Sequence, residues 1–446
     1  MEQGDQTTAQ PSSAGARRSH STRLGRAVFP HWVDHNLRVI LVSRFAMSVA
    51  RAIAGVVTAL YLAAEGFSSI EIGALFVGVT VVSALLSSGI GLVSDRVGRR
   101  PFLVGVPLLA AGAALLYALD RTPAVLFLAA ALGSFGRGAG AGGGSVGPYQ
   151  PAESAFVAES VPAQTRAAAF GRLAFTSALG ALVGGLLAGL ASVHPHMTRS
   201  GALVAYRPAF LAAAALALVA GIVALSLREE RHRAPHSAQR RLAWPRHSWP
   251  ALWRFWVTNG TNGFAIGMTG PFISYWLYRR YGAPPAEIGL LFAFVNLASL
   301  AATLSASRVG RRLGTVRAIA GVRGLSALLL VPMVLAPGFW FAGMIYLVRM
   351  LAQRIGLPLR QSFTQDLAHP AERSSVAALA NLPAQATMAG SQAFAGYLFA
   401  EVSLAAPFEI ASVFQLANAL LYVALFTWRP PRARHLPHGA APADSS

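Results

Sequence analysis

The chain has 446 residues, of which 54% are hydrophobic and only 12% are charged, and its formal net charge is +20. Soluble domains carry about twice that share of charged residues. The composition therefore excludes a disordered chain and a fibrous repeat, and it argues against a soluble globular enzyme. The sequence contains no cysteine, which excludes disulfides, thiolate metal sites and cysteine nucleophiles.

Long apolar stretches dominate the chain after a polar start. Residues 1–36 are rich in Ser, Arg and Gln and show no apolar period, which predicts a disordered cytoplasmic tail. From Leu37 onward, apolar stretches alternate with short polar breaks, and each stretch is long enough to cross a lipid bilayer as a helix. The sequence predicts twelve such spans: 37–63, 69–94, 101–119, 122–147, 167–193, 203–227, 252–278, 288–307, 318–338, 339–359, 374–400 and 405–428.

One long polar segment, 228–251, divides the twelve predicted spans into six and six. We therefore expect an N-terminal six-helix bundle at 37–227 and a C-terminal six-helix bundle at 252–428, joined by a cytoplasmic linker at 228–251. A second cytoplasmic tail is expected at 429–446. The predicted fold is an all-α integral membrane protein with two pseudo-symmetric six-helix bundles, and the protein is expected to be a monomer.

The basic residues, all of which are arginine, indicate how the chain is oriented. With a cytoplasmic N-terminus, 26 arginines fall in cytoplasmic segments, 5 in outer connections and 6 within spans. Positive residues collect in the cytoplasmic loops of membrane proteins. The pattern thus predicts a multi-pass protein of the plasma (inner) membrane with both termini cytoplasmic. Because topology accounts for the positive charge, nucleic-acid binding is not expected.

The two halves repeat short motifs at equivalent places. Arg96-Val97-Gly98-Arg99-Arg100 follows the second span, and Arg308-Val309-Gly310-Arg311-Arg312 follows the eighth. Arg137 in the fourth span likewise has a counterpart, Arg349, in the tenth. Parallel repeats of six helices are typical of transporters that hold a substrate near the midplane, between the two repeats.

The segment Gly91-Leu-Val-Ser-Asp95-Arg96-Val-Gly98-Arg99-Arg100 resembles the G-x-x-x-D-R-x-G-R-R signature of the major facilitator superfamily, in the expected connection between the second and third spans. The resemblance implies a secondary transporter, not an enzyme, that needs no cofactor and rocks two bundles about a central site. It also implies that Gly91, Asp95, Arg96, Gly98, Arg99 and Arg100 form a gating motif. In this motif Asp95 is expected to latch one state against the start of the eleventh span, near Ser374.

Small residues in the fifth span resemble a second signature of the family. Gly180, Gly184, Gly185 and Gly189 follow the antiporter pattern G-x-x-x-G-P-x-x-G-G, although Gly185 replaces the proline and Ala188 replaces a glycine. Small residues at this spacing also let helices pack closely in any membrane protein. Close packing and an antiporter-specific role therefore both remain open.

Six arginines lie inside apolar spans. A charge at the centre of a membrane helix costs roughly 2.5–3.5 kcal/mol, so each should face protein or water. The family resemblance places the first, fourth, seventh and tenth helices around the cavity. The substrate-site candidates on these helices are Arg44, Arg51, Arg137, Arg349, Arg354, Asn259 and Asn262. Arg44 and the sixth arginine, Arg323, could instead extend to the cytoplasmic interface, and the asparagines could join helices.

Acidic residues are scarce in the predicted spans, and Glu153, after the fourth span, is one of the few near the cavity helices. Arg137 resembles the arginine of a fourth-helix motif that is linked to proton coupling in the major facilitator superfamily, although the usual glutamine is missing here. Arg137 and Glu153 are therefore the candidates for coupling transport to protons. A cavity with arginines and few acids favours an anionic substrate, because guanidinium binds carboxylate and phosphate bidentately. In a purely structural reading, Arg137 and Arg349 instead pair with Glu153 and Asp366 between helices. No metal site is expected.

Together these patterns predict proton-coupled export of a small amphipathic or anionic compound by alternating access, with no nucleotide as energy source. Export follows from a general similarity to bacterial efflux members of the family. Two alternatives remain: an importer of an organic anion, and a non-transporting membrane sensor built on the same fold.

Overall fold

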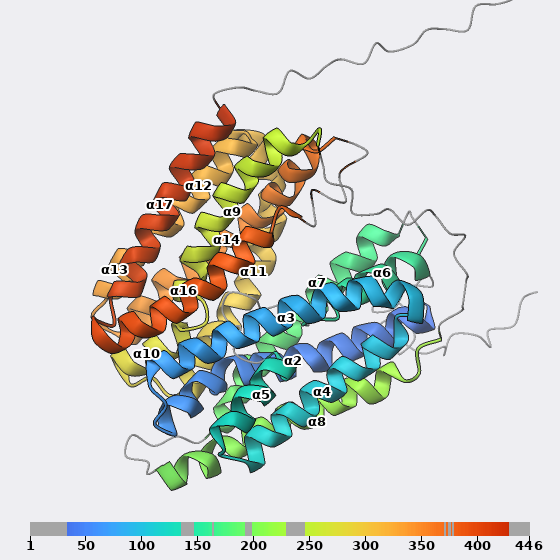
Figure 1. The fold of residues 1–446 in the computed structure, drawn as a ribbon, viewed down its shortest axis with the longest axis vertical. Coiled ribbons are helices and arrows are strands. Elements are labelled where there is room, and N and C mark those ends of the chain that lie inside the picture. The colour runs from blue at the N-terminus through green and yellow to red at the C-terminus, as the bar shows by residue number, and fades with distance from the viewer. Residues whose placement is uncertain are drawn as a thin grey trace, which may run out of the picture.

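The structure, a computed structural model, describes residues 34–134, 147–162, 165–191, 199–228, 246–369, 372, 376 and 379–427. Within these ranges all regular structure is helical and no strand occurs. Figure 1 shows two groups of helices, one from each half of the chain. Seven segments of the described chain are long and apolar enough to cross a membrane. The predicted all-α membrane fold with two bundles is confirmed.

The N-terminal half is built around its first helix. It comprises α2 (His35–Ala64), α3 (Ser69–Val97), α4 (Arg100–Leu119), α5 (Pro123–Gly133), α6 (Gln150–Ser160), α7 (Arg166–Leu187), the short 3-10 helix η1 (Ala188–Leu190) and α8 (Arg199–Ala224). Asp34 begins α2 by accepting a 2.8 Å hydrogen bond from the backbone N–H of Leu37. Because α2 packs against both α7 and α8, most of its side chains are buried, and its polar residues must find partners inside the protein.

The helices of the C-terminal half form two packing groups. It comprises α9 (Trp249–Thr269), α10 (Ile273–Tyr281), α11 (Pro285–Leu313), α12 (Thr315–Leu328), α13 (Leu330–Leu335), α14 (Phe339–Leu367), α16 (Leu382–Glu401) and α17 (Ala406–Thr427). Helix α9 packs against α16 and α17, whereas α14 packs against α11 and α12. The space between these two groups becomes important below.

Several predicted spans differ from the described helices: 252–278 is divided into α9 and α10, and 318–338 is divided into α12 and α13. The span 122–147 is not one described helix, because α5 ends at Gly133 and α6 begins only at Gln150, with residues 135–146 outside the described part. The span predicted to end at residue 359 continues to Leu367 in α14. The proline at position 358 does not end α14, since helices packed in membrane proteins tolerate the loss of one backbone donor. Arg360, predicted in a connection, therefore lies inside a helix.

The two halves touch at one end of the molecule, which we call the closed end. Here α3 packs against α16, and α7 packs against α11. A Cβ atom on Gly289 would lie 1.9 Å from the carbonyl oxygen of Gly185, so these backbones meet only because neither residue has a side chain. Nearby, the hydroxyl of Thr80 donates a buried 2.9 Å hydrogen bond to the Oε1 atom of Gln392.

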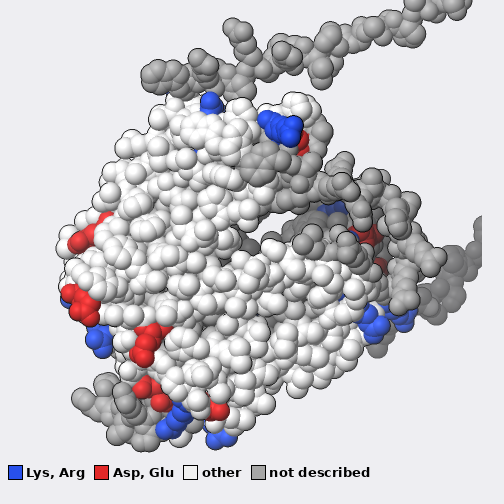
Figure 2. All heavy atoms as spheres, viewed as in Figure 1, with Lys and Arg blue, Asp and Glu red and all other residues white. Residues whose placement is uncertain are grey.

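At the opposite end, the open end, the two halves separate. Figure 1 shows the bundles diverging toward the starts of α2 and α9, and the space-filling view in Figure 2 is hollowed between them. In the same view the charged side chains gather near the ends of the helices, and a broad uncharged band lies between them. Large apolar side chains such as Leu85, Leu335 and Phe341 are at least two-thirds exposed, as expected where helices face lipid.

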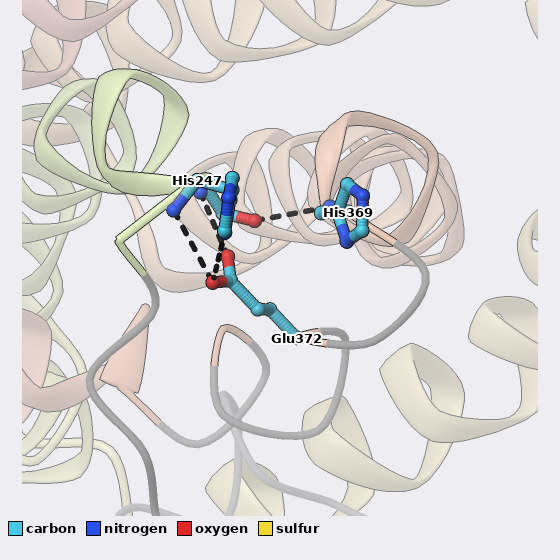
Figure 3. Close-up of polar contacts among 4 residues, drawn as sticks. His247, His369 and Glu372 are labelled. Carbon is cyan, nitrogen blue, oxygen red and sulfur yellow. Dashed lines mark hydrogen bonds and ion pairs between the residues drawn. The ribbon is translucent and has the colours of Figure 1, made fainter.

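A small polar cluster fastens the start of α9 to the segment that follows α14 (Figure 3). Glu372 accepts hydrogen bonds from the backbone N–H groups of His247 (3.2 Å) and Ser248 (2.8 Å). The backbone N–H of His369 donates to the Ser248 hydroxyl, and the two histidine rings stack 5.4 Å apart. Burial acts to raise the pKa of Glu372, but hydrogen bonds from Ser248 and His247 outweigh it and lower the pKa to about 2. This cluster therefore places the end of α14 at the open end.

Candidate functional site

The segment expected to be a gating motif contacts other helices of the N-terminal half. Gly98 ends α3 with a φ of +101°, a backbone conformation that favours glycine. Arg99 forms an ion pair with Glu159 of α6, and Arg100 donates a 2.5 Å hydrogen bond to the carbonyl of Leu225. Gly91 has open space around it among the described atoms.

The predicted latch of this motif lies outside the described part of the structure. The side chains of Asp95 and Arg96 are not described, and neither is Ser374, near which the contact was expected. The latch therefore stays a prediction. Arg137, the first coupling candidate, also lies outside the described residues.

Arg44 is neutralised inside the N-terminal half. Its guanidinium forms an ion pair with Glu153 of α6, and its Nε donates a 2.5 Å hydrogen bond to the hydroxyl of Ser177 on α7. Arg44 is 6% exposed and Glu153 is 2% exposed. The pair thus joins three helices, and Glu153 gives this half a buried group that can accept a proton.

Arg51 lies beside the interruption between α5 and α6. Its Nη2 donates a 3.1 Å hydrogen bond to the carbonyl of Ser134, the left-handed residue that ends α5. A Cβ atom on Gly147 would lie 2.8 Å from the guanidinium, so the same side chain also borders the chain just before α6. Arg51 therefore touches both sides of the segment that contains Arg137.

The two asparagine candidates of α9 have different surroundings. Asn259 is 2% exposed and donates a 2.7 Å hydrogen bond to the carbonyl of Ala380, so it joins α9 to the chain before α16. Asn262, one turn further along the helix, instead borders a cavity. The structure thus gives the first asparagine a packing contact and places the second at a potential ligand site.

The cavity has a volume of about 130 Å³ and lies between the two packing groups of the C-terminal half. Four helices, α9, α12, α14 and α17, contribute to its wall. Its polar lining residues are Asn262, Arg323, Ser326, Gln353, Arg354, Arg360 and Gln415, and no acidic residue lines it. An arginine-rich cavity without a carboxylate is suited to hold an anion.

Two of the lining arginines have donor atoms that no described residue satisfies. Arg323 stacks on Tyr422, with its guanidinium carbon 4.8 Å from the ring centre, and its Nη1 has no hydrogen-bond partner in the described chain. The same holds for Nε and Nη2 of Arg354. Arg360 lines the same cavity and adds a further positive charge to it. The cluster therefore carries positive charge that no acidic residue in the described lining compensates.

Arg349, five residues before Arg354 on α14, is only 4% exposed, and its Nε likewise lacks a partner among the described groups. Asp366, the carboxylate considered for it, is exposed and accepts a 3.4 Å hydrogen bond from Ser362. The five acidic residues of this half lie near helix ends or in the connection before α16: Glu287, Asp366, Glu372, Glu401 and Glu409. The interior of the C-terminal half is thus positive.

Sequence reasoning assigned two residues of the cluster elsewhere. Arg323 was expected to reach the cytoplasmic interface, and Arg360 was placed in a connection. Their shared signal is the pair of glutamines, Gln353 and Gln415, inside otherwise apolar spans. Buried amides in membrane helices mark polar interiors, and these two border the same cavity as the arginines.

The model of the Major Facilitator Superfamily matches residues 40–260 and again residues 255–445. The chain belongs to this superfamily. Its membership shows a membrane-embedded transporter with a small-molecule substrate. The two matched ranges together cover most of the chain.

Solved structures of the same superfamily fold cover nearly the whole chain. A bacterial homolog of the human lysosomal transporter Spinster, in an inward-facing and unoccupied conformation, is 13% identical, covers 90% of this chain and 96% of its own, and has a TM-score of 0.64. The nucleoside transporter NupG is 14% identical over 89% of this chain and 100% of its own, with a TM-score of 0.69. A bacterial metal transporter is 14% identical over 88% and 99%, with a TM-score of 0.64. No curated protein sequence matches the chain. At these identities the solved structures show the fold alone.

Proposed function

We propose that this superfamily member is a proton-coupled transporter that exports a small anionic compound by alternating access. The observation that carries the proposal is the cavity bordered by Arg323, Arg354 and Arg360 without an acidic residue. Unpaired charge is costly inside a membrane protein. A bound anion would compensate that charge and satisfy the free guanidinium donors of Arg323 and Arg354.

The size of the cavity favours a small compound over a large amphipathic one. Its volume of about 130 Å³ is below the roughly 300–1,000 Å³ of pockets that hold drug-sized ligands. Of the two substrate classes predicted from the sequence, the anionic class is therefore the better fit to this site.

The arrangement of the two halves, which touch at one end and separate at the other, corresponds to one state of the proposed transport cycle. The halves touch through Gly185 and Gly289 at the closed end and separate at the open end. With the N-terminus in the cytoplasm, as we propose from the arginine distribution, the open end faces the cytoplasm. The cycle then requires that the glycine contact breaks while the other ends of the bundles approach each other.

We assign proton coupling to Glu153 because it is the buried acid of the described N-terminal core, paired with Arg44. Protonation of Glu153 removes the negative charge that holds the Arg44 guanidinium. The proton therefore changes the contacts among α2, α6 and α7 without touching the anion cavity. The direction of transport rests on the similarity to efflux members, and an inward electrochemical proton gradient would drive export by exchange.

Transport in proteoliposomes tests the proposal directly. Purified protein is reconstituted, and efflux of radiolabelled small anions is followed with and without an imposed pH gradient. We expect saturable anion flux that R354Q reduces at least tenfold, whereas R279Q, which removes an exposed arginine at the end of α10, leaves it unchanged. If R354Q transports anions like the unaltered protein, the cavity is not the substrate site. Absence of flux for every anion, together with flux of a cation or neutral compound, would overturn the proposal.

The coupling assignment needs an experiment of its own. The variant E153Q keeps the shape of the side chain and a hydrogen-bond acceptor for Arg44 but does not bind a proton. We expect E153Q to retain anion counterflow between the two sides of the vesicle while net transport no longer responds to the pH gradient. Counterflow also reports that the variant is folded. Retained gradient-driven transport in E153Q would exclude Glu153 as the coupling residue.

A further inference from the structure

The anion cavity also constrains how many charges its ligand carries. We infer that the substrate is a small dianion, a dicarboxylate or a phosphate monoester, bound by the arginines of this cavity; this rests on the proposed function and makes it more specific. The argument uses the number of uncompensated arginines, their depth along α14 and α12, and the polar groups that remain for a neutral part of the ligand.

The charge balance of the cavity is the first step. Arg323 and Arg354 both have N–H donors without partners in the described chain, and neither forms an ion pair there. No acidic residue borders the cavity. A ligand with a single negative charge would leave one of these two guanidinium groups uncompensated in a low-dielectric environment, which is unfavourable. Two negative charges balance these two arginines, whereas Arg360, the third lining arginine, is not among the described residues with a buried donor atom that lacks a partner.

The third arginine lies nearer to the open end. Arg360 follows Arg354 by six residues on α14, which corresponds to about 9 Å along the helix axis. The end of α14 lies at the open end, where His369 contacts Ser248 at the start of α9. Arg360 is therefore placed to attract an anion as it approaches, while Arg323 and Arg354 bind it deeper in the cavity.

The ligand is expected to be short, because the cavity is small and its arginines come from two neighbouring helices. Arg323 belongs to α12 and Arg354 to α14, and these helices pack against each other. The Arg323 guanidinium is fixed over the ring of Tyr422. Two anionic groups a few bonds apart, or the oxygens of one phosphate, can reach both guanidinium groups bidentately.

Helices α9 and α17, which belong to the other packing group, add uncharged polar side chains to the cavity lining. The Oε1 atom of Gln415 on α17 is buried and has no hydrogen-bond partner among the described residues. Asn262 of α9 also borders the cavity. These amides can bind a hydroxyl or amide of the ligand. A substrate with two negative charges and a neutral hydrogen-bonding group therefore fits the lining better than a simple inorganic anion.

Matched pairs of small compounds test the charge count. Succinate is compared with butyrate, and methyl phosphate with dimethyl phosphate, because each pair differs mainly in the number of negative charges. Binding to the purified full-length protein is measured by thermal shift and by competition with transported anion, at neutral pH and fixed ionic strength. We expect each dianion to bind at least tenfold more tightly than its monoanionic partner. Which of the two dianions binds better distinguishes a dicarboxylate from a phosphate substrate.

The variants R323Q and R354Q sharpen the test. Removal of one charge-assisted contact should weaken dianion binding about 10- to 100-fold while changing monoanion binding much less, so that the preference for dianions collapses. R279Q, with the same change at an exposed site, should keep the preference. If monoanions bind as tightly as dianions in the unaltered protein, the charge count is wrong although anion transport stands. If no anion binds and no anion is transported, the proposed function fails as well.

Discussion

The two halves of the molecule differ in whether a buried arginine has an acidic partner. In the N-terminal half, Arg44 has a carboxylate partner, Glu153, and a hydroxyl partner, Ser177. In the C-terminal half, Arg323 and Arg354 border a cavity with free donor atoms and no acid in its lining. The two halves repeat the same motifs but place their acidic residues differently, and this placement decides whether a buried arginine has a carboxylate partner.

This difference separates two tasks that a coupled transporter must perform. A paired arginine is neutral as a unit and responds to a proton, because protonation of Glu153 breaks the pair. An unpaired arginine attracts an anion and is insensitive to a proton, because guanidinium stays charged at any relevant pH. We therefore regard the N-terminal half as the coupling half and the C-terminal half as the binding half. The following predictions can break or sharpen this division.

The largest change in stability is expected from E153L, which leaves Arg44 buried without its carboxylate partner. Breaking a buried ion pair by removing one member costs about 3–5 kcal/mol, so the thermal midpoint of purified protein should fall strongly. The double variant R44M/E153L removes both charges and should recover most of the loss. The control E401L removes an exposed acid at the end of α16 and should have little effect on the thermal midpoint. If the double variant is as unstable as E153L, the unpaired charge of Arg44 is not the main cause of the lost stability.

In the C-terminal half, removal of a buried charge is expected to stabilise the protein and not to destabilise it. Without ligand, R354Q removes a charge that no described residue compensates, and should raise the free energy of unfolding by about 1–3 kcal/mol. The thermal midpoint of ligand-free protein should therefore rise in R354Q and stay constant in R279Q. A clear loss of stability in R354Q would mean that Arg354 has a structural partner, and the contrast between the halves would disappear.

The contact between the halves is tested by G289A. A methyl group there would lie 1.9 Å from the carbonyl of Gly185, so it should disfavour the state described here by about 1–3 kcal/mol, the usual cost of overpacking. The chain has no cysteine, which permits a single reporter, S274C, at a buried site on α10 that packs near α2.

We expect G289A to increase labelling of S274C by a maleimide added from the closed end. The control G105A adds a methyl group where no atom lies within 4 Å and should leave labelling unchanged. Equal labelling in G289A and the unaltered protein would mean that the glycine contact does not hold the closed end together.

The smallest effect is expected from Glu372, whose charge lies outside the membrane-spanning part. Its folded pKa of about 2 is below the ordinary value of 4.5, so the ionised side chain stabilises the start of α9 above pH 4.5, and this contribution is lost as the pH falls toward 2. E372Q should therefore lower the thermal midpoint slightly at pH 7, and the difference should shrink between pH 4.5 and pH 2. A difference that stays constant over this range would exclude the carboxylate as its source.

Local sequence determined much of the fold because a membrane helix must be long, apolar and internally hydrogen bonded. Hydropathy located the helices, the arginines indicated their orientation, and the motif from Gly91 to Arg100 indicated the superfamily. Gly98 of this motif has a positive φ at the end of α3. The course of α14 past the proline at 358 was not predicted, since a proline can end a helix or be tolerated within it, depending on the packing around it.

The pairing of charges was decided by the tertiary structure alone. Arg44 and Glu153 are 109 residues apart and meet only because α2 and α6 lie together against α7. Arg323 and Arg354 border one cavity because α12 packs against α14, although the sequence suggested that Arg323 reaches the interface. Hydropathy records how apolar a segment is and therefore identifies helices. Whether a buried guanidinium has a carboxylate or an empty cavity beside it depends on which helices pack together, and only the folded chain shows that.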